Sequence, residues 1–392
     1  MQVAGREAQT IRPPLESRIA QLLRAQLHLV IEARGGGVVT VQPLFETTRG
    51  QIVESIHYGS IAVVDSNGRL LASYGDPQTV AFLRSSAKPF QALPFVERGG
   101  VEHFGLTLRE LSLACASHEG SRMHIEAVIE MQGKVGIQES HLQCGSHLPG
   151  DVDEFKSLIV HGTEPTPNYN NCSGKHTAML AHAKMRGLPL ENYLDINHPI
   201  QQDILASFAD MCLIPLNRIE LGTDGCSAPN FAVPLYNAAL GMARFCDPRE
   251  LSETRAEACR KIIHAMTTHP EMVSAYGEFD EQLMRTGEGR FITKRGAEGF
   301  QIVGVMPGVL SPDSPGIGIA FKVSDGDAAR MSDTLELRTR VRPAVTVEIL
   351  HQLGALSSEQ EQALASFGPV TSIRNHRGIV TGQARPAFEL DR

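Results

Sequence analysis

The stretch Arg84-Ser85-Ser86-Ala87-Lys88-Pro89 places a serine hydroxyl and a lysine amine three residues apart. On a helix, this spacing puts both side chains on one face. A lysine kept neutral by burial or by a neighbouring cation can take the proton of a serine and make it a nucleophile. The pattern therefore indicates Ser85 and Lys88 as a catalytic pair. The alternative is that Ser85 or Ser86 caps a helix that ends at Gly99-Gly100, with Lys88 in solvent.

Composition limits what the rest of the chain can be. Its 392 residues are 42% hydrophobic and 20% charged, which is typical of a soluble globular protein of one large or two ordinary domains. A net charge of −8, no Trp and only 5% aromatic residues argue against nucleic-acid binding. We expect no membrane span and no secretory leader. Seven sparse cysteines indicate a reducing compartment, so small-molecule chemistry in the cytoplasm is expected.

Periodic segments predict the fold class. Residues 51–65 alternate, turn at Ser66-Asn67-Gly68 and continue over 69–72, which predicts a hairpin. A block of predicted helices follows, the first of them introduced by a capping box at Thr107–Glu110. These helices cover residues 111–116, 121–134, 172–186, 200–212, 236–244 and 249–268. Three strands, 287–294, 300–305 and 316–323, and a helix within 325–352 complete an α+β pattern in which terminal strands close one sheet.

The region before residue 44 is set apart from this pattern. Residues 15–32 have apolar positions at helical spacing and precede the loop Gly35-Gly36-Gly37. We therefore expect residues 1–43 to form an extension and residues 44–392 to form a single domain.

Three loop segments carry candidate functional side chains. Ser117-His118-Glu119-Gly120 interrupts two apolar helices and is either a site for exposed side chains or a plain connection. Cys172 stands at the start of a helix, where the macrodipole favours its thiolate. Cys226 lies in the turn-rich segment 222–229, whereas Cys212 follows a four-residue apolar repeat and is expected in the core.

Five motifs in this order resemble those of the class 3, rhizobial-type L-asparaginases, the asparaginase II family, over residues 44 to the mid-380s. The motifs are Arg84-Ser-Ser-Ala-Lys-Pro89, Ala116-Ser-His-Glu-Gly120, Asn170-Asn-Cys-Ser-Gly-Lys-His176, Thr223-Asp-Gly-Cys226 and Lys294-Arg-Gly-Ala-Glu-Gly299. The resemblance implies a fold like that of the serine β-lactamases and penicillin-binding proteins, an antiparallel sheet with a helical region. It also implies hydrolysis of L-asparagine and a homodimer.

The resemblance further implies a set of site residues. Two serine–lysine tandems correspond to Ser85 with Lys88 and to Ser117 with Lys294. The implied zinc ligands are Cys172, Lys175 and Cys226, with water completing the shell. Two thiolates, a third ligand and an open position suit Zn²⁺, although the spacing of Cys172 and Lys175 does not by itself indicate a metal.

The residues suggest how the chemistry would run. Ser85 would attack the amide carbon, Lys88 would take its proton, and Ser117 would relay protons. Lys294 would lower the pKa of Lys88 as a second cation. The rival assignment makes Ser117 the nucleophile and Lys294 its base.

Three further residues are candidates for substrate contacts. Arg84 and Asp224 are candidates for the substrate α-carboxylate and α-ammonium, or they are a helix neighbour and a turn residue. His176 would orient the zinc-bound water or touch the substrate.

Two other functions remain open at this stage. The Ser-x-x-Lys pattern and Lys294-Arg295-Gly296 also suit a penicillin-recognising hydrolase, but Ser117-His118-Glu119 stands where those enzymes have Ser-x-Asn. The other alternative is a non-catalytic protein that binds zinc or an amino acid. The motif serines and lysines are all present, which argues against lost catalysis.

Overall fold

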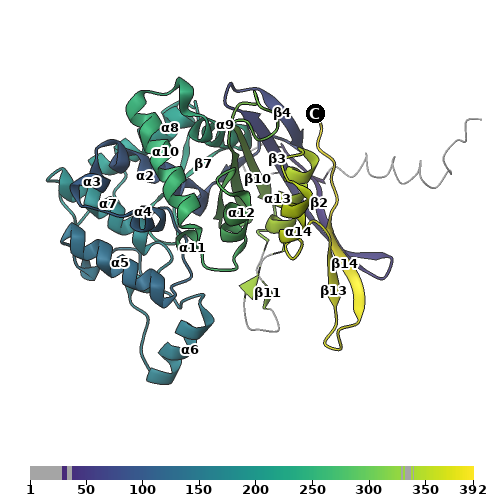
Figure 1. Cartoon of the computed structure of the whole chain (residues 1–392), viewed down its shortest axis with the longest axis horizontal. Helices are drawn as coiled ribbons and strands as arrows, with labels where there is room; N and C mark the ends of the chain where they lie inside the picture. The colour runs from purple at the N-terminus through teal and green to yellow at the C-terminus, as the bar shows by residue number, and fades with distance from the viewer. Residues whose placement is uncertain (1–28, 33–37, 328–329, 332–336, 339) are drawn as a thin grey trace, which may run out of the picture.

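A nine-stranded antiparallel sheet stands beside a helical region in the computed structural model, which describes residues 29–32, 38–327, 330–331, 337–338 and 340–392 (Figure 1). The α+β prediction is therefore confirmed. In the described part of the chain, no helix is both long and apolar enough to cross a membrane.

The large sheet joins both ends of the chain. Its strand order is β13-β14-β2-β3-β10-β9-β8, with β1 paired to β2 and β4 to β3. The strands are β1 (Leu29–Glu32), β2 (Val38–Arg49), β3 (Ile52–Asp65), β4 (Leu70–Tyr74), β8 (Phe291–Gly296), β9 (Phe300–Val305), β10 (Ile317–Val323), β13 (Thr371–Arg374) and β14 (Val380–Pro386). In register, Ile61 of β3 lies opposite Phe321 of β10, and Phe45 of β2 lies opposite Pro386 of β14.

Most predicted strands are confirmed. The β3–β4 hairpin turns through a bond from the Gly68 N–H to the Asp65 carbonyl (3.0 Å). The three strands predicted between residues 287 and 323 are β8, β9 and β10. The helix predicted over 15–32 lies mostly outside the described residues, and its last four residues form β1 instead. The division at residue 43 stays a prediction.

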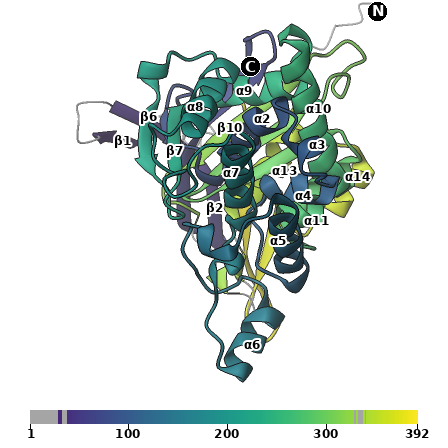
Figure 2. The same cartoon turned by 90° about the vertical axis from the view of Figure 1, so that its left-hand side faces the viewer.

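The helical region is built from short helices and a small sheet (Figure 2). The helices are α2 (Lys88–Glu97), α3 (Gly100–His103), α4 (Leu108–Ala114), α5 (Arg122–Val135), α6 (Val152–His161), α7 (Ser173–Met185), α8 (Pro199–Met211), α9 (Leu235–Cys246), α10 (Glu253–Thr268), α11 (Pro270–Val273) and α12 (Phe279–Gly287). The C-terminal part adds α13 (Val341–Gln352) and α14 (Ser358–Ala363). The 3₁₀ turns are η1 (Arg84–Ala87), η2 (Glu139–His141), η3 (Pro167–Tyr169), η4 (Leu216–Arg218) and η5 (Pro248–Glu250). Small sheets pair β5 (Val80–Phe82) and β6 (Glu220–Thr223) with β7 (Pro229–Pro234), and β11 (Arg330–Met331) with β12 (Leu337–Arg338).

Local chemistry explains where several helices begin. Thr107 and Glu110 form both bonds of the predicted capping box at the start of α4. Cys172 is the residue before α7, as expected, and the His198 side chain caps α8 by accepting from the Ile200 N–H. The last predicted helix is shorter than expected, because α13 begins only at Val341.

Two apolar cores lie on opposite faces of the large sheet. Along β3, Ala62 and Val64 belong to the core shared with the helical region, while Ile61 and Val63 belong to the core shared with α12 and α13. Helix α9 packs tightly against β10, because a Cβ on Gly318 would lie only 1.8 Å from the Ala239 carbonyl oxygen. This packing fixes the helical region on the sheet.

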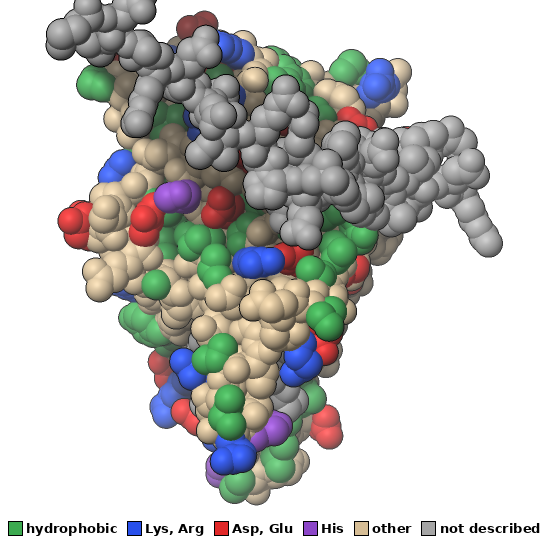
Figure 3. Space-filling view, turned by 90° about the vertical axis from the view of Figure 1, so that its right-hand side faces the viewer, with side chains coloured by type: hydrophobic (Ala, Val, Ile, Leu, Met, Phe, Trp, Pro, Cys, Tyr) green, Lys and Arg blue, Asp and Glu red, His purple; other side chains and the backbone are tan. Residues whose placement is uncertain are grey.

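The right-hand side of the molecule in Figure 1 carries the β13–β14 ribbon. Ile379 and Val380 of this ribbon are about half exposed, as is Val370 before it. Hydrophobic side chains on the visible part of this face lie among charged ones (Figure 3).

Candidate active site

Ser85 and Lys88 lie at the junction of η1 and α2. Ser85 belongs to the 3₁₀ turn η1, and Lys88 is the first residue of α2, three positions later. No side chain among the described residues caps the start of η1 or the start of α2. The Ser86 hydroxyl instead donates to the Lys294 carbonyl (2.7 Å). The alternative in which these serines cap a helix is therefore wrong.

The Lys88 amine is buried at the meeting point of three segments. It donates to Ser117 Oγ (2.9 Å), to the Asn171 carbonyl (3.2 Å) and to the Ala116 carbonyl. Only 1% of the residue is exposed, so the prediction of a solvated lysine is also wrong. Burial lowers the pKa of Lys88 from its ordinary value. A lowered pKa makes the amine lose a proton more readily, and only its neutral form can act as a base.

Ser117 and Lys294 complete the second predicted tandem. Ser117 lies in the loop between α4 and α5, and its N–H donates to the Val273 carbonyl (2.9 Å). Lys294 is fully buried on β8, and its amine donates to the Arg295 carbonyl (3.0 Å). Burial, with the nearby cations Lys88 and Arg295, holds the pKa of Lys294 well below its ordinary value. The Ser117 hydroxyl thus contacts the amine of Lys88, which belongs to the first predicted tandem.

Two sulfurs and an amine form a buried group beside Lys88. The Lys175 amine lies 3.0 Å from Cys226 Sγ, and Cys172 Sγ lies 3.2 Å from the side-chain oxygen of Asn171. A hydrogen bond from Cys226, aided by Lys88 and Lys175, lowers the pKa of Cys172 although burial opposes this shift. Burial also opposes a charge on Lys175, yet the two sulfurs raise its pKa.

The donor atoms of this group are of the kinds that bind a zinc ion. Soft thiolates are preferred zinc ligands, and an amine can serve as the third. His176 lies next in sequence, and its buried Nε2 has no hydrogen-bond partner among the described residues, as expected where something else would fill the space. No group of three His, Cys, Asp or Glu side chains in the described residues could hold a metal. Zinc binding at this group stays a prediction, in which Lys175 is the third ligand.

Arg84 and Asp224 form an ion pair next to the sulfurs. Arg84 Nε lies 2.6 Å from Asp224 Oδ1, and Cys226 Sγ lies 4.0 Å from the other carboxylate oxygen. Burial opposes the charge of Asp224, but Lys175 and Arg84 lower its pKa. Arg84 has a φ of 52°, an uncommon value for a residue other than glycine, and its N–H donates to Asn230 Oδ1 (3.1 Å). The two predicted substrate contacts thus bind each other.

A cleft of about 590 Å³ opens beside Arg84. Such a volume is within the range of small-molecule sites. Its polar lining comes from Arg84, Thr79, Glu298, Lys322 and Ser324, and its apolar wall comes from Val80, Phe82 and Leu221. Among the described residues, Arg84 is the one predicted site residue that lines this cleft.

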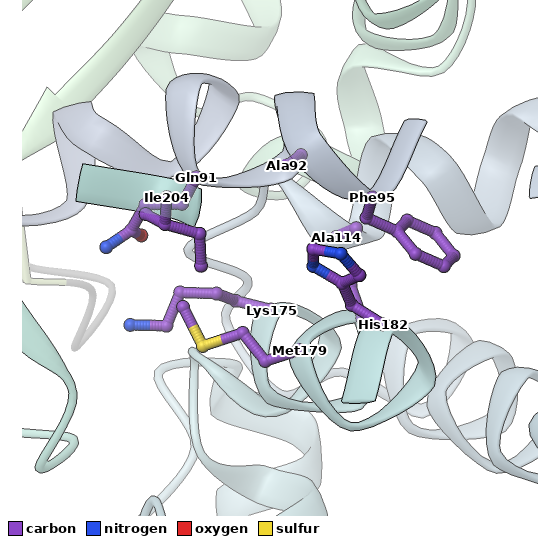
Figure 4. Close-up of a pocket in the computed structure, with 9 residues that line it drawn as sticks. Gln91, Ala92, Phe95, Ala114, Lys175, Met179, His182 and Ile204 are labelled. Carbon is purple, nitrogen blue, oxygen red and sulfur yellow. The ribbon is translucent and has the colours of Figure 1, made fainter. Parts of the chain in front are cut away.

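A second cavity lies behind Lys175 and holds only about 10 Å³. Lys175, Met179 and His182 border it, and the Lys175 amine points away from His182 (Figure 4). This space suits one water molecule and excludes an amino acid.

Comparison with known proteins identifies the chain's relatives. Residues 45–386 match the family described as L-asparaginase II. The chain belongs to the L-asparaginase II family. This membership makes it an amidohydrolase. No curated protein matches the chain.

Two solved structures similar to this L-asparaginase II family member are glutaminases. One is a probable glutaminase from Bacillus subtilis complexed with 6-diazo-5-oxo-L-norleucine, 12% identical, with 90% of this chain and 99% of that chain covered and a TM-score of 0.37. The other is a Bacillus glutaminase, 12% identical, with 76% and 91% covered and a TM-score of 0.35.

The site of this L-asparaginase II family member contains charged residues to which the sequence analysis gave no role. Arg295 and Glu119 lie inside two of the quoted motifs and form an ion pair with each other. Glu278 and Asp280 also bind Arg295 but lie near the start of α12, where acidic residues are common for capping reasons alone. The position of Arg295 next to Lys294 was the clue available in the sequence.

Proposed function

We propose that this protein hydrolyses L-asparagine to L-aspartate and ammonia, as a class 3, rhizobial-type enzyme with a serine β-lactamase-like fold. Family membership supports the amide chemistry. The observation that carries the proposal is the buried Lys88 amine, which is hydrogen-bonded to Ser117 and lies one 3₁₀ turn from Ser85. A buried amine with a lowered pKa can supply the neutral base that a serine nucleophile requires.

Ser85 is the nucleophile in this proposal. Its Oγ attacks the side-chain amide carbon while Lys88 takes the hydroxyl proton. The carbon–nitrogen bond then breaks, and the proton passes through Ser117 to the leaving ammonia. The product is a β-aspartyl ester on Ser85. Water then attacks this ester, with Lys88 accepting a proton and Ser85 regaining one, and L-aspartate leaves.

The hydrogen bonds favour a relay role for Ser117. Its hydroxyl accepts from Lys88, whereas the Lys294 amine donates to a backbone carbonyl. Burial, and then the nearby Lys175 cation, lower the pKa of Lys88. The pKa of Lys294 is itself held well below its ordinary value, so Lys294 is not the cation that keeps Lys88 neutral in this proposal. The rival, with Ser117 as nucleophile and Lys294 as base, requires Lys294 to turn away from that carbonyl.

Substrate binding uses the ion pair at the cleft. Arg84 takes the substrate α-carboxylate and Asp224 its α-ammonium, so the substrate replaces the bond that the two side chains make with each other. His176 lies on α7 beside Lys175 and borders the same group. Glutamine is one methylene longer, a difference for which pockets discriminate by only about 1–3 kcal/mol.

Cys172, Lys175 and Cys226 would hold a zinc ion in this proposal. When bound, zinc supplies a fixed positive charge that polarises the site. The zinc content of the purified protein tests this assignment. We expect about one zinc per chain in the wild type and in Cys259→Ser, whose thiol is buried elsewhere, and a large loss in Cys226→Ser. Equal zinc in both variants would contradict it.

Ammonia release tests the proposed reaction. L-Asparagine and L-glutamine are supplied in parallel to the wild type, Ser85→Ala and Ser117→Ala. The matched control is Ser112→Ala, a buried serine of α4 whose hydroxyl donates to the His269 carbonyl.

We expect release from asparagine by the wild type and the control, none by Ser85→Ala, and a reduced rate in Ser117→Ala. If the Ser85→Ala variant is active, the role of nucleophile would be assigned to Ser117 instead. Hydrolysis of a chromogenic cephalosporin without any ammonia release would favour the penicillin-recognising class instead. Sedimentation of the same sample tests the proposed homodimer.

A further inference from the structure

Arg295 links three parts of the site through its side chain and its backbone carbonyl. Its Nη1 donates to Glu278 Oε2 (2.7 Å), and its Nη2 pairs with Glu119 and approaches the Ser117 carbonyl (3.5 Å). Its own backbone carbonyl accepts from the Lys294 amine (3.0 Å). One residue therefore touches the strand of Lys294, the loop of Ser117 and the start of α12.

We infer that Arg295 is a positioning residue, which holds the loop of Ser117 against β8 and so fixes the separation of Ser117 and Lys294. This inference rests on the proposed function, because Ser117 and Lys294 matter for turnover only there. Arg295 itself does not touch the reacting atoms in this assignment.

The Ser117 loop is fixed from its other side by backbone bonds. The Ser117 N–H donates to the Val273 carbonyl (2.9 Å), and the Glu119 N–H donates to the Ser274 carbonyl (3.2 Å). These bonds set the loop against α11. Arg295 contributes the contact toward β8, in addition to the bonds that the Lys88 amine makes to the Ala116 carbonyl and to Ser117 Oγ.

Glu119 is itself held in place for this contact. A Cβ at Gly150 would lie 1.7 Å from Glu119 Oε2, so Gly150 leaves the space that the carboxylate occupies. Gly150 thus lies against Oε2 of Glu119, whereas Arg295 pairs with Oε1. Gly150 and the ion pair with Arg295 are thus two independent features that fix the position of the Glu119 carboxylate.

The chemistry of the guanidinium explains why an arginine is needed. Its planar fork can bind two carboxylates from different elements, whereas a lysine ammonium is a single point charge. The backbone N–H of Arg295 donates to the buried Asp280 (2.7 Å), a bond that does not depend on the arginine side chain. Burial opposes the charge of Arg295, but Glu119 and Glu278 hold its pKa above the ordinary value. The residue therefore stays charged throughout turnover.

Arg295→Lys tests the inference on the full chain, with Arg255→Lys as its matched control. Arg255 also pairs with two carboxylates, Glu97 and Asp210, and its side chain is 19% exposed against 26% for Arg295. We expect Arg295→Lys to lower kcat for asparagine by about 100-fold, as a misplacement of about 1 Å can. KM should stay within about threefold, because the substrate contacts are intact. Arg255→Lys should have the kcat of the wild type, and its Tm should be similar to that of Arg295→Lys.

Several results would overturn this inference. A kcat within about threefold of wild type in Arg295→Lys would do so, and so would an equal loss in Arg255→Lys, which would show a general effect of stability. If Arg295→Lys does not fold, Glu119→Gln removes only the loop side of the contact and should lower kcat about tenfold. An unchanged kcat there also rejects the inference. A wild type that releases no ammonia rejects the proposed function instead.

Discussion

Lys88 and Lys294 are lysines that most proteins would keep at the surface. They are 1% and 0% exposed. Burying an amine disfavours its charged form, so each must stay neutral or find compensating partners. A catalytic base gains from this arrangement, whereas the folded state loses stability. Burial of these two lysines thus lowers the stability of the folded state and increases the reactivity of their amines.

Lys294→Met should stabilise the protein while abolishing turnover. The folded-state pKa of Lys294 is depressed, so below the unfolded value of about 10.4 the unfolded chain binds the extra proton, and the stability of the folded state decreases as the pH is lowered. We expect the variant to be more stable at pH 7 by about 1 kcal/mol. That gain should shrink as the pH rises, and it should vanish only above about pH 10.4, where the amine is neutral in both states.

Urea unfolding at pH 7 and pH 9.5 measures this difference. The control is Lys156→Met, at an exposed position, which should change stability by less than about 0.5 kcal/mol. A variant less stable than wild type at pH 7 would contradict the prediction.

Lys88→Arg should remove the proposed base without removing the positive charge. A guanidinium is not deprotonated in proteins, so the ammonia-release rate should fall by about 10²–10⁴-fold. The control is Lys184→Arg, since Lys184 donates to the Gly136 carbonyl away from the site. Rates and Tm are measured together. Retention of more than a tenth of the wild-type rate would show that Lys88 is not the base.

The contact between η1 and β8 sets the site at the scale of elements. A Cβ on Gly296 would lie 2.3 Å from the Leu83 carbonyl oxygen and 2.9 Å from Ser86 Oγ. Only glycine lets the strand of Lys294 approach the turn of Ser85 this closely. The Ser86 bond to the Lys294 carbonyl then locks the two elements together.

Gly296→Ala should therefore impair both folding and turnover. We expect a loss of about 1–3 kcal/mol in stability, because a backbone atom must shift, with a lower kcat from a displaced Ser85. Gly133→Ala is the control, since no described atom lies within 4 Å of its Cβ on α5, and it should gain about 0.5–1 kcal/mol. Thermal melts and ammonia release check both. A fully active, equally stable Gly296→Ala would refute this account.

The sequence predicted elements best where the pattern was local. The capping box of α4 and the β3–β4 turn involve residues within four positions, so their chemistry can be read directly. Helix α6, the small sheet and the β13–β14 ribbon were missed. The β14 strand depends on pairing with β2, and half-exposed residues such as Val380 give no clear alternation.

The predicted site residues are brought together by the fold. Contacts run from Arg84 through Asp224 and Cys226 to Lys175, and Lys88 bonds to Ser117. Their roles remain predictions. The partners of Arg295 could not be inferred, because Glu119 and Glu278 are far apart in sequence and meet only through tertiary packing.

At the scale of the whole molecule, one apolar core joins the sheet to the helical region. Phe90, two residues after Lys88, packs edge-on against Phe208 (5.6 Å) and Phe245 (5.4 Å). Strand residues such as Ile302 belong to the same core. The helix that carries Lys88 is therefore anchored by the same packing that holds the sheet.

Phe245→Ala should lower the stability of the whole protein by about 3–5 kcal/mol. Because the core is shared, circular dichroism and intrinsic fluorescence should report one coincident transition at a lower Tm. The control is Ile159→Ala, at a position 63% exposed, with less than about 0.5 kcal/mol of change. Two separate transitions in Phe245→Ala would mean that the helical region and the sheet unfold independently.

The pairing of β3 with β10 has a consequence for synthesis on the ribosome. Ile61 can pair with Phe321, and Phe45 with Pro386, only after those later residues have been synthesised. The sheet therefore cannot close while the chain is still being translated. Until then the edge of β3 is open to other nascent chains. Lys294 also emerges late, so a stalled translation product would carry the Ser85 turn and the Cys172 helix but no working catalytic centre.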